Sequence, residues 1–219
     1  KQKTAYEILT CDWSSDVCSS DLIIVANNDF PGKTLAELIA ISKKDPKGIS
    51  YGTSGAGGTP HIAGELLKQK TGANLVHVPY KGGGQALLDL LGGNIPLVYT
   101  AVAGANQYVA TGRIKAIAVS SAKRSPSMPD VPTFIESGVK DFVIDDWVGL
   151  LAPAKTPMPI INKLNQALNE ILSSPEGRAK LLSMCIFASP GTPEKFGEQI
   201  KGDLARFAPI VKAAQIKSE

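Results

Sequence analysis

A glycine-rich loop between a predicted strand and a predicted helix is the first segment whose residues suggest chemistry. It reads GTSGAGGTPH over residues 52–61. Backbone amides and two hydroxyl groups at the start of a helix favour an anion, because the helix dipole is positive there. Gly58 stands where a phosphate-binding loop requires lysine, and the G-x-G-x-x-G spacing of a dinucleotide site is missing. The loop therefore predicts a carboxylate site, with a turn that only allows close packing as the alternative.

A second loop of the same kind follows the next predicted strand and reads HVPYKGGG over residues 77–84. Tyr80 offers an apolar wall with a hydroxyl tip, and the glycines offer another set of backbone amides. Lys81 supplies either a cation for the ligand or a solvated surface charge. Two such loops at the carboxyl ends of neighbouring strands are typical of the ligand crevice of an open α/β sheet.

Neither histidine of the chain lies in a pattern typical of catalysis. His61 falls in the first turn of a predicted helix, and His77 lies in a predicted strand between two valines. Asp145 and Asp146 are adjacent in the chain, so in a strand their side chains point to opposite faces and do not form a metal pair. The G-x-S-x-G and H-E-x-x-H motifs are absent. We therefore expect no enzyme activity, no metal and no cofactor.

The elements that position the two loops alternate between strands and helices. Thr34 and Glu37 form a capping box at the start of one of these helices. Alternation at this spacing predicts an α/β fold with a mostly parallel sheet. The predicted strands are 23–26, 49–52, 74–79, 95–100 and 114–120, and the predicted helices are 34–44, 59–70, 85–91 and 104–111.

The C-terminal part has a different character. A connection rich in Pro, Ser and Asp over 121–146 leads to an apolar strand at 147–153. Three helices then begin at Ser-Pro or Thr-Pro pairs, and one short strand lies near 185–188. We expect that this part cannot cover its own apolar faces and that its sheet comes from elsewhere. One helix has an apolar face with nothing local to receive it, formed by Ile160, Ile161, Leu164, Leu168 and Leu172.

The opening residues 1–22 differ from the rest of the chain. They contain SSD twice within eight residues, have no apolar period and lack a signal-peptide pattern. The string CDWSSDVCSSDL resembles the conceptual translation of sequencing-adapter DNA. We therefore predict that 1–22 is a non-native segment without structural ties to the rest, and that the chain is truncated at its N-terminus.

The amino-acid composition excludes several classes of protein. The 219 residues are 43% hydrophobic and 20% charged, which excludes a disordered tail. The formal charge is only +3, and the basic residues are scattered along the chain, so we do not expect a nucleic-acid-binding protein. Three cysteines are too few for a disulfide framework.

Several motifs together resemble a known family. The stretches from YGTSGAGGTPHIAGELL to NIPLVYT, then GRIKAIAVSSAKRSPSMPDVPTF and WVGLLAPAKTP, are similar to substrate receptors of the tripartite tricarboxylate transporters, the Bug-type periplasmic binding proteins. The resemblance covers 23–219. It implies a monomeric two-lobed Venus-flytrap fold, with the first lobe incomplete, that captures small carboxylates in the periplasm and presents them to membrane permease subunits.

The resemblance also implies where the ligand binds. Thr100 lies in a Tyr-Thr-Ala stretch where the family commonly has Phe-Asp-Asn, so an amino-acid ligand is less expected than a carboxylic acid without an amino group. The implied ligand-binding residues are Thr53, Ser54, Gly55, Gly57, Gly58, Thr59, His61, Tyr80, Lys81, Gly82, Gly83 and Thr100.

The resemblance assigns 23–26 to a crossover strand, 27–145 to the second lobe and 146–219 to the C-terminal part of the first lobe. An alternative of another class is a Rossmann-like enzyme that binds a nucleotide phosphate with the loop from Gly52 to Thr59. The missing loop lysine and the missing acid–base pair count against it.

Overall fold

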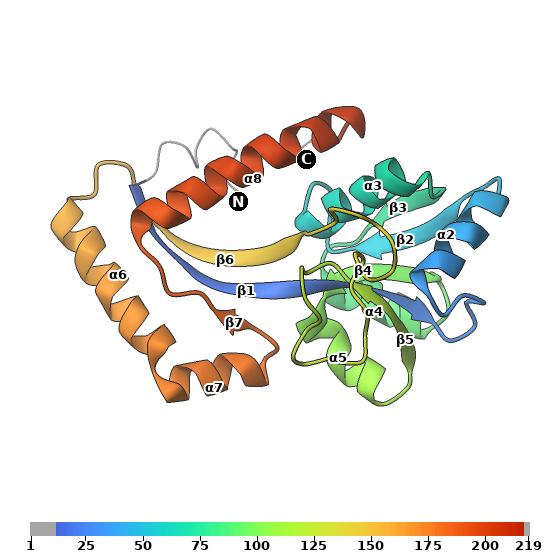
Figure 1. The fold of residues 1–219 in the computed structure, drawn as a ribbon, viewed down its shortest axis with the longest axis horizontal. Coiled ribbons are helices and arrows are strands. Elements are labelled where there is room, and N and C mark those ends of the chain that lie inside the picture. The colour runs from blue at the N-terminus through green and yellow to red at the C-terminus, as the bar shows by residue number, and fades with distance from the viewer. Residues whose placement is uncertain (1–11, 217–219) are drawn as a thin grey trace. The chain divides into compact units, whose positions relative to one another are not determined.

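The computed structural model describes the backbone of residues 12–216 and the side chains of 19–216. The described chain divides into two compact units (Figure 1). Unit 1 contains 12–19 and Trp147–Pro209, and unit 2 contains Ser20–Asp146 and 210–216. No helix in the described part of the chain is long and apolar enough to cross a bilayer.

Unit 2 is built on a sheet with the strand order β3-β2-β4-β1-β5. Strand β2 runs parallel to both β3 and β4, whereas β1 runs antiparallel to β4 and β5. The predicted α/β class with a mostly parallel sheet is therefore confirmed, with β1 as the one antiparallel strand of this order. The strands are β1 (Asp12–Asn27), β2 (Ile49–Thr53), β3 (Leu75–Pro79), β4 (Leu97–Ala101) and β5 (Ile114–Val119).

The core of unit 2 centres on β1. Its unbroken apolar run from Leu22 to Ala26 is fully buried, as is typical of a strand covered on both faces. Helices connect the strands and pack on the sheet (Figure 1). They are α2 (Leu35–Lys44), α3 (Thr59–Thr71), α4 (Gly83–Leu91) and α5 (Val102–Ala110).

Two helices begin two residues before their predicted starts. Helix α4 begins at Gly83 and helix α5 begins at Val102. Helix α3 begins at Thr59, as predicted, with Gly58 as its N-cap. The predicted capping box of α2 is present, since the Thr34 hydroxyl accepts from the Glu37 amide and the Glu37 carboxylate accepts from the Thr34 amide.

Unit 1 holds the first two predicted C-terminal helices, the third as far as Pro209, and the two strands between and before them. Strands β6 and β7 both pair with β1, outside the strand order of unit 2, and Figure 1 shows β6 running beside β1. Strand β6 begins within unit 2 and continues into unit 1. The elements are β6 (Asp145–Ala152), α6 (Met158–Ser173), α7 (Pro175–Ser183), β7 (Phe187–Ala188) and α8 (Pro193–Ala213).

The expectation that residues 1–22 have no structural tie to the rest is wrong for 12–22. The predicted strand 23–26 is the end of a 16-residue strand that begins at Asp12. Cys18 and Ser19 pair with β7, and Leu22 pairs with Ala101 and is fully buried. Sequence reasoning missed this because strand pairing is made with residues far along the chain. Residues 1–11 lie outside the described residues, and the origin of the segment stays a prediction.

The two compact units differ from the predicted lobe ranges at two points. The division between the units falls after Asp146, one residue beyond the predicted end of the second lobe at 145. However, 210–216 lie in unit 2 rather than with the rest of 146–219. The side chain of Ile216 lies close to the glycine loop of unit 2. A Cβ atom placed on Gly57 of this loop would lie 3.7 Å from the Ile216 side chain.

Candidate functional site

Three helices begin at one edge of the unit 2 sheet. Strands β2, β3 and β4 are parallel, so their carboxyl ends lie at the same edge, and α3, α4 and α5 start directly after them. Within the described residues, none of these three helices has a side-chain hydrogen bond at its N-cap. Helix α2 follows the antiparallel β1 at the opposite edge and has a full capping box. Unpaired amides are therefore concentrated at one edge, where they can bind an anion.

The loop after β2, the start of α4 and the end of β4 meet at Ser54, Gly83 and Thr100. A Cβ atom placed on Gly83 would lie 3.3 Å from Thr100 Oγ1 and 4.0 Å from Ser54 Cβ. Ser54 is exposed, and Thr100 keeps 8% of its surface accessible. Neither hydroxyl group makes a hydrogen bond within the described chain. These two hydroxyls are thus available beside the first turn of α4.

Thr53 lies beneath the glycine loop rather than on its surface. Its side chain is fully buried, and its hydroxyl donates to the Gly55 carbonyl at 3.0 Å. The same oxygen lies 2.7 Å from His77 Nε2. Direct contact between Thr53 and a ligand was predicted, but the hydroxyl is already occupied in holding the loop.

His61 is also placed under the loop. Its Nδ1 accepts a hydrogen bond of 3.0 Å from the Gly57 amide, and only 8% of the residue is accessible. Its ring stacks on His77 with the centroids 3.6 Å apart and the planes 12° apart. His61 therefore supports the glycine loop from below, and a direct ligand contact, which the sequence predicted, is not what its position favours.

Burial keeps both imidazoles neutral at neutral pH. The pKa of His77 is lowered to about 4, mainly by burial and to a smaller extent by His61 and Lys68. Burial also lowers the pKa of His61, an effect that Glu65 opposes and Lys68 reinforces. Glu65 accepts hydrogen bonds from Tyr51 and Lys68 at 3.3 and 2.9 Å, so the carboxylate beside the rings is already paired.

The second predicted loop contributes its backbone more than its side chains. Tyr80 is half-buried, its hydroxyl donates to Asp89 Oδ2 at 2.8 Å, and its amide donates to the Thr53 carbonyl at 3.0 Å. This hydrogen bond ties the end of β3 to the end of β2. Lys81 is exposed and makes no ion pair with any described residue. Gly82 is the N-cap of α4 and has a φ of 145°, which a glycine adopts readily.

The glycine loop itself requires glycine at two positions. Gly57 has a φ of 75° and Gly55 a φ of 151°, both in the region that favours glycine. The Gly57 amide points at His61, whereas the amides of Ala56 and Gly58 donate to no described residue. The loop therefore presents unpaired amides next to the start of α3.

Asp146 is a residue of this edge that sequence reasoning did not assign to the site. The Thr59 hydroxyl donates to Asp146 Oδ1 at 3.0 Å, across 87 positions of the chain. No local pattern marks such a contact, because it depends on where β6 begins. The described residues contain no group of His, Cys, Asp and Glu that is arranged to hold a metal ion.

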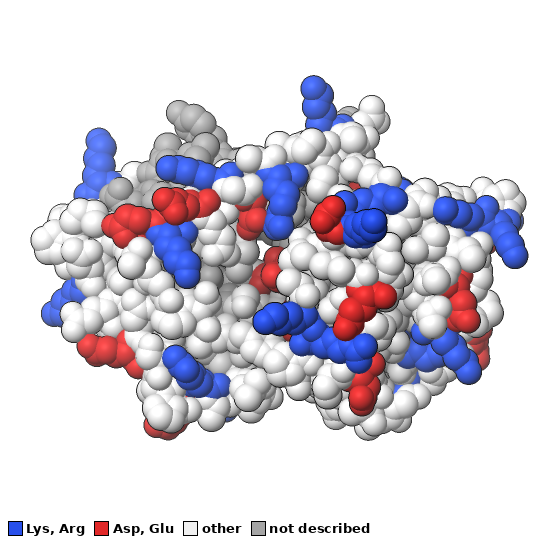
Figure 2. All heavy atoms as spheres, in the orientation of Figure 1, with Lys and Arg blue, Asp and Glu red and all other residues white. Residues whose placement is uncertain are grey.

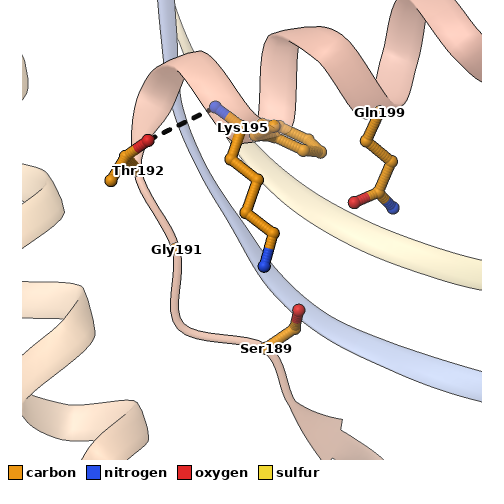
Figure 3. Close-up of a pocket in the computed structure, with 6 residues that line it drawn as sticks. Ser189, Gly191, Thr192, Lys195 and Gln199 are labelled. Atoms are coloured by element: carbon orange, nitrogen blue, oxygen red, sulfur yellow. Dashed lines mark hydrogen bonds between the residues drawn. The ribbon is translucent and has the colours of Figure 1, made fainter.

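Two hollows elsewhere do not suit an organic acid. The cavity in Figure 3 lies in unit 1 and has a volume of about 10 Å³, which is the space of one water molecule. A larger hollow of about 330 Å³ lies by Thr71, at the C-terminal end of α3, where the helix dipole is negative. On the face drawn in Figure 2, basic and acidic side chains are interspersed and form no single-sign patch.

Known proteins resemble this chain over most of its length. Residues 2–216 match the family described as tripartite tricarboxylate transporter family receptor. The UPF0065 protein in the TAR-I ttuE-ttuC' intergenic region of Agrobacterium vitis is 35% identical over 196 residues, which are 88% of this chain and 57% of that protein. The chain thus spans just over half the length of that relative.

Solved structures share the fold. R. palustris Rpa4515 with adipate has a TM-score of 0.88 and 28% identity, covering 94% of this chain and 69% of that one. The periplasmic binding protein BugD has a TM-score of 0.85 and 32% identity, with coverages of 95% and 71%. These likenesses confirm the predicted α/β periplasmic-binding-protein fold class.

Proposed function

We propose that this chain, which belongs to the tripartite tricarboxylate transporter receptor family, binds a small carboxylate at the edge of unit 2 where α3, α4 and α5 begin. The family is one of receptors and not of enzymes, which removes the alternative of a nucleotide-binding enzyme. The predicted resemblance to Bug-type receptors is confirmed by the family match and by the likeness to BugD.

The observation that carries the proposal is the junction of Ser54, Gly83 and Thr100. Two unoccupied hydroxyls lie beside the first turn of α4, and a second set of free amides lies at Ala56 and Gly58. A helix N-terminus stabilises a nearby negative charge by about 0.3–1 kcal/mol at exposed sites, and up to about 2 kcal/mol in partly buried geometries. Three uncapped starts at one edge add their contributions, so one carboxylate can be bound without a cationic side chain.

The side chains under the loop set its shape rather than its charge. Thr53 and His61 each hydrogen-bond to one glycine of the loop, and Tyr80 ties the two loops together through its amide. Lys81 is the exposed cation of the second loop and contributes a longer-range attraction to an anion. We therefore assign direct contacts to Ser54, Thr100 and the loop amides.

Relatives and the residues at the edge support the chemical class of the ligand that we propose. Rpa4515 was solved with adipate, a dicarboxylate, and this supports a carboxylate ligand for the present chain. Thr100 itself offers a neutral hydroxyl and no carboxylate for an amino group, and the Asp146 carboxylate of this edge already accepts from the Thr59 hydroxyl. We propose a carboxylic acid without an amino group, captured in the periplasm and delivered to the permease subunits of a tripartite tricarboxylate transporter.

Isothermal titration calorimetry of the full chain with adipate tests the proposal. The uncharged 1,6-hexanediol, which has the same number of carbons, is the matched ligand control. We expect measurable heat for adipate only, and Thr100→Val or Ser54→Ala should each weaken binding by about 1–2 kcal/mol, the value of one hydrogen bond to a charged group.

Ser173→Ala is the matched control variant, because Ser173 is exposed in unit 1 at the end of α6. It should leave adipate binding unchanged. Equal affinity in the wild type, Thr100→Val and Ser54→Ala proteins would remove this edge from the binding site.

A further inference from the structure

We propose that His61 and His77 are positioning residues, which hold the glycine loop from below as a stacked pair of neutral imidazoles that both carry their proton on Nε2. The effect on the loop is independent of the ligand. The effect on carboxylate affinity rests on the proposed function.

The proton positions follow from the hydrogen bonds of the loop. The Gly57 amide is a donor, so His61 Nδ1, 3.0 Å away, must be an unprotonated acceptor. The single proton of neutral His61 therefore lies on Nε2, which faces Glu65 Oε1 at 3.9 Å. The other tautomer would place two N–H groups against each other.

The same counting of donors and acceptors shows which ring nitrogen of His77 carries the proton. The Thr53 hydroxyl has one proton, and it donates that proton to the Gly55 carbonyl at 3.0 Å. The hydroxyl oxygen must then accept from His77 Nε2, which lies 2.7 Å away. His77 thus acts on the loop through Thr53, and His61 acts on it directly through Gly57.

The two rings depend on each other. Their centroids are 3.6 Å apart and their planes nearly parallel, so a positive charge on one ring opposes a charge on the other. The titratable groups that face the pair are Tyr51 of β2 and the Glu65–Lys68 ion pair of α3. The Glu65 carboxylate is shared with Lys68 and Tyr51, which leaves it a weak partner for an imidazolium.

Protonation would break the arrangement at a specific atom. A second proton on His61 must go to Nδ1, the atom that accepts from Gly57, and the loop would lose that hydrogen bond. Gly57 has a φ of 75° and lies between Ala56 and Gly58, whose amides are free. Release of Gly57 would therefore change the direction of the amides proposed to bind the carboxylate.

Long-range ¹H–¹⁵N NMR of the imidazole rings in the full chain tests the proton positions. At pH 7 we expect both rings as Nε2–H tautomers, and we expect the Gly57 amide signal to shift when His61 is protonated at lower pH. A Nδ1–H tautomer of His61 at pH 7 would overturn the proposal.

Two variants of His61 separate the hydrogen bond from the ring. His61→Asn keeps an acceptor oxygen near the position of Nδ1 but loses the ring, and His61→Phe keeps a stacking ring but has no acceptor. We expect His61→Phe to weaken adipate binding about 10-fold and to move the Gly57 signal, whereas His61→Asn stays within about 3-fold of the wild type. A melting curve of each variant shows that it is folded.

The outcomes distinguish this inference from the proposed function. If adipate binds and His61→Phe changes neither the affinity nor the Gly57 signal, the positioning role is wrong and the proposed function stands. If the tautomers and the Gly57 response are as expected but the wild type does not bind adipate, the positioning role stands and the proposed function fails.

Discussion

The two units bury their apolar side chains to very different extents. In unit 2, the strands and helices enclose a core in which Leu22, Tyr51 and Tyr99 are fully buried. In unit 1, helix α6 buries Ile161 and Leu172 but leaves Ile160 and Leu164 about half exposed. Of the eleven large hydrophobic residues that are exposed in the described chain, eight lie in unit 1, namely Val148, Leu150, Met158, Ile160, Leu164, Ile171, Leu182 and Met184.

The difference follows from how each unit is assembled. Each parallel strand of unit 2 is joined to the next by a helix that packs on the sheet, so the unit closes its core with local connections. The strands of unit 1 pair only with β1 in the described chain. Unit 2 should therefore be the more stable part of the molecule. The stability of unit 1 should depend on the pairing of its strands with β1.

Deletion of residues 1–22 should have the largest effect, and it should fall on unit 1. The deletion removes Asp12–Leu22 of β1, which includes the residues that pair with β7 and the buried Leu22, and it shortens the strand with which β6 pairs. Hydrogen exchange should become faster by more than about 100-fold in β6 and β7, since their hydrogen-bonding partner is shortened. Strand β3, which pairs with β2, serves as the internal control and should keep its protection. Unchanged exchange in β6 would show that the segment carries no structure.

Two isoleucine substitutions compare the units directly. Ile24 is fully buried at the centre of unit 2, whereas Ile160 on α6 is 50% exposed. Ile24→Ala should lower the free energy of unfolding by about 2–5 kcal/mol through lost burial and a cavity. Ile160→Ala should change it by less than about 0.5 kcal/mol. Urea denaturation measures both, and equal losses would contradict the assignment of a closed core to unit 2.

Local sequence patterns were sufficient to predict the parts of the fold that local contacts determine. The capping box of α2 and the Pro-marked starts of α6, α7 and α8 are examples. The positions of the two glycine loops were also predictable, because glycines after apolar strands mark the carboxyl edge of a parallel sheet. The prediction that Ile160 and Leu164 have nothing local to receive them is confirmed by their exposure, and it was wrong for Ile161 and Leu172.

Long-range contacts account for what the sequence did not reveal. The extension of β1 to Asp12 depends on pairing with β6 and β7, which lie more than a hundred positions away. The stacking of His61 on His77 and the hydrogen bond from Thr59 to Asp146 join different elements. The types of these residues were visible in the sequence, but their orientations were set only by the assembled sheet.

We expect glycine-to-alanine substitutions to change stability in opposite directions in the two units, by smaller amounts than the substitutions above. Gly57 has a φ of 75°, so Gly57→Ala should cost about 1–2 kcal/mol of stability in unit 2. Gly202 lies in helix α8 with open space around it, so Gly202→Ala should stabilise unit 1 by up to about 1 kcal/mol. Melting temperatures of the two variants should move in opposite directions, and a fall in both would remove the contrast.

The smallest expected effect is a pH dependence confined to unit 2, which holds both histidines of the chain. Burial lowers the pKa of His61, and it lowers that of His77 to about 4, so the unfolded chain binds protons more readily than the folded one below pH 6.5. Stability is therefore complete above about pH 6.5 and falls as the pH decreases toward the lowered pKa values. Between pH 7 and pH 6 the loss should be less than about 1 kcal/mol per histidine. Hydrogen exchange at the two pH values, corrected for its intrinsic rate, should show reduced protection in β2 and β3 and unchanged protection in α6. An equal change in α6 would mean that groups other than this histidine pair set the pH response.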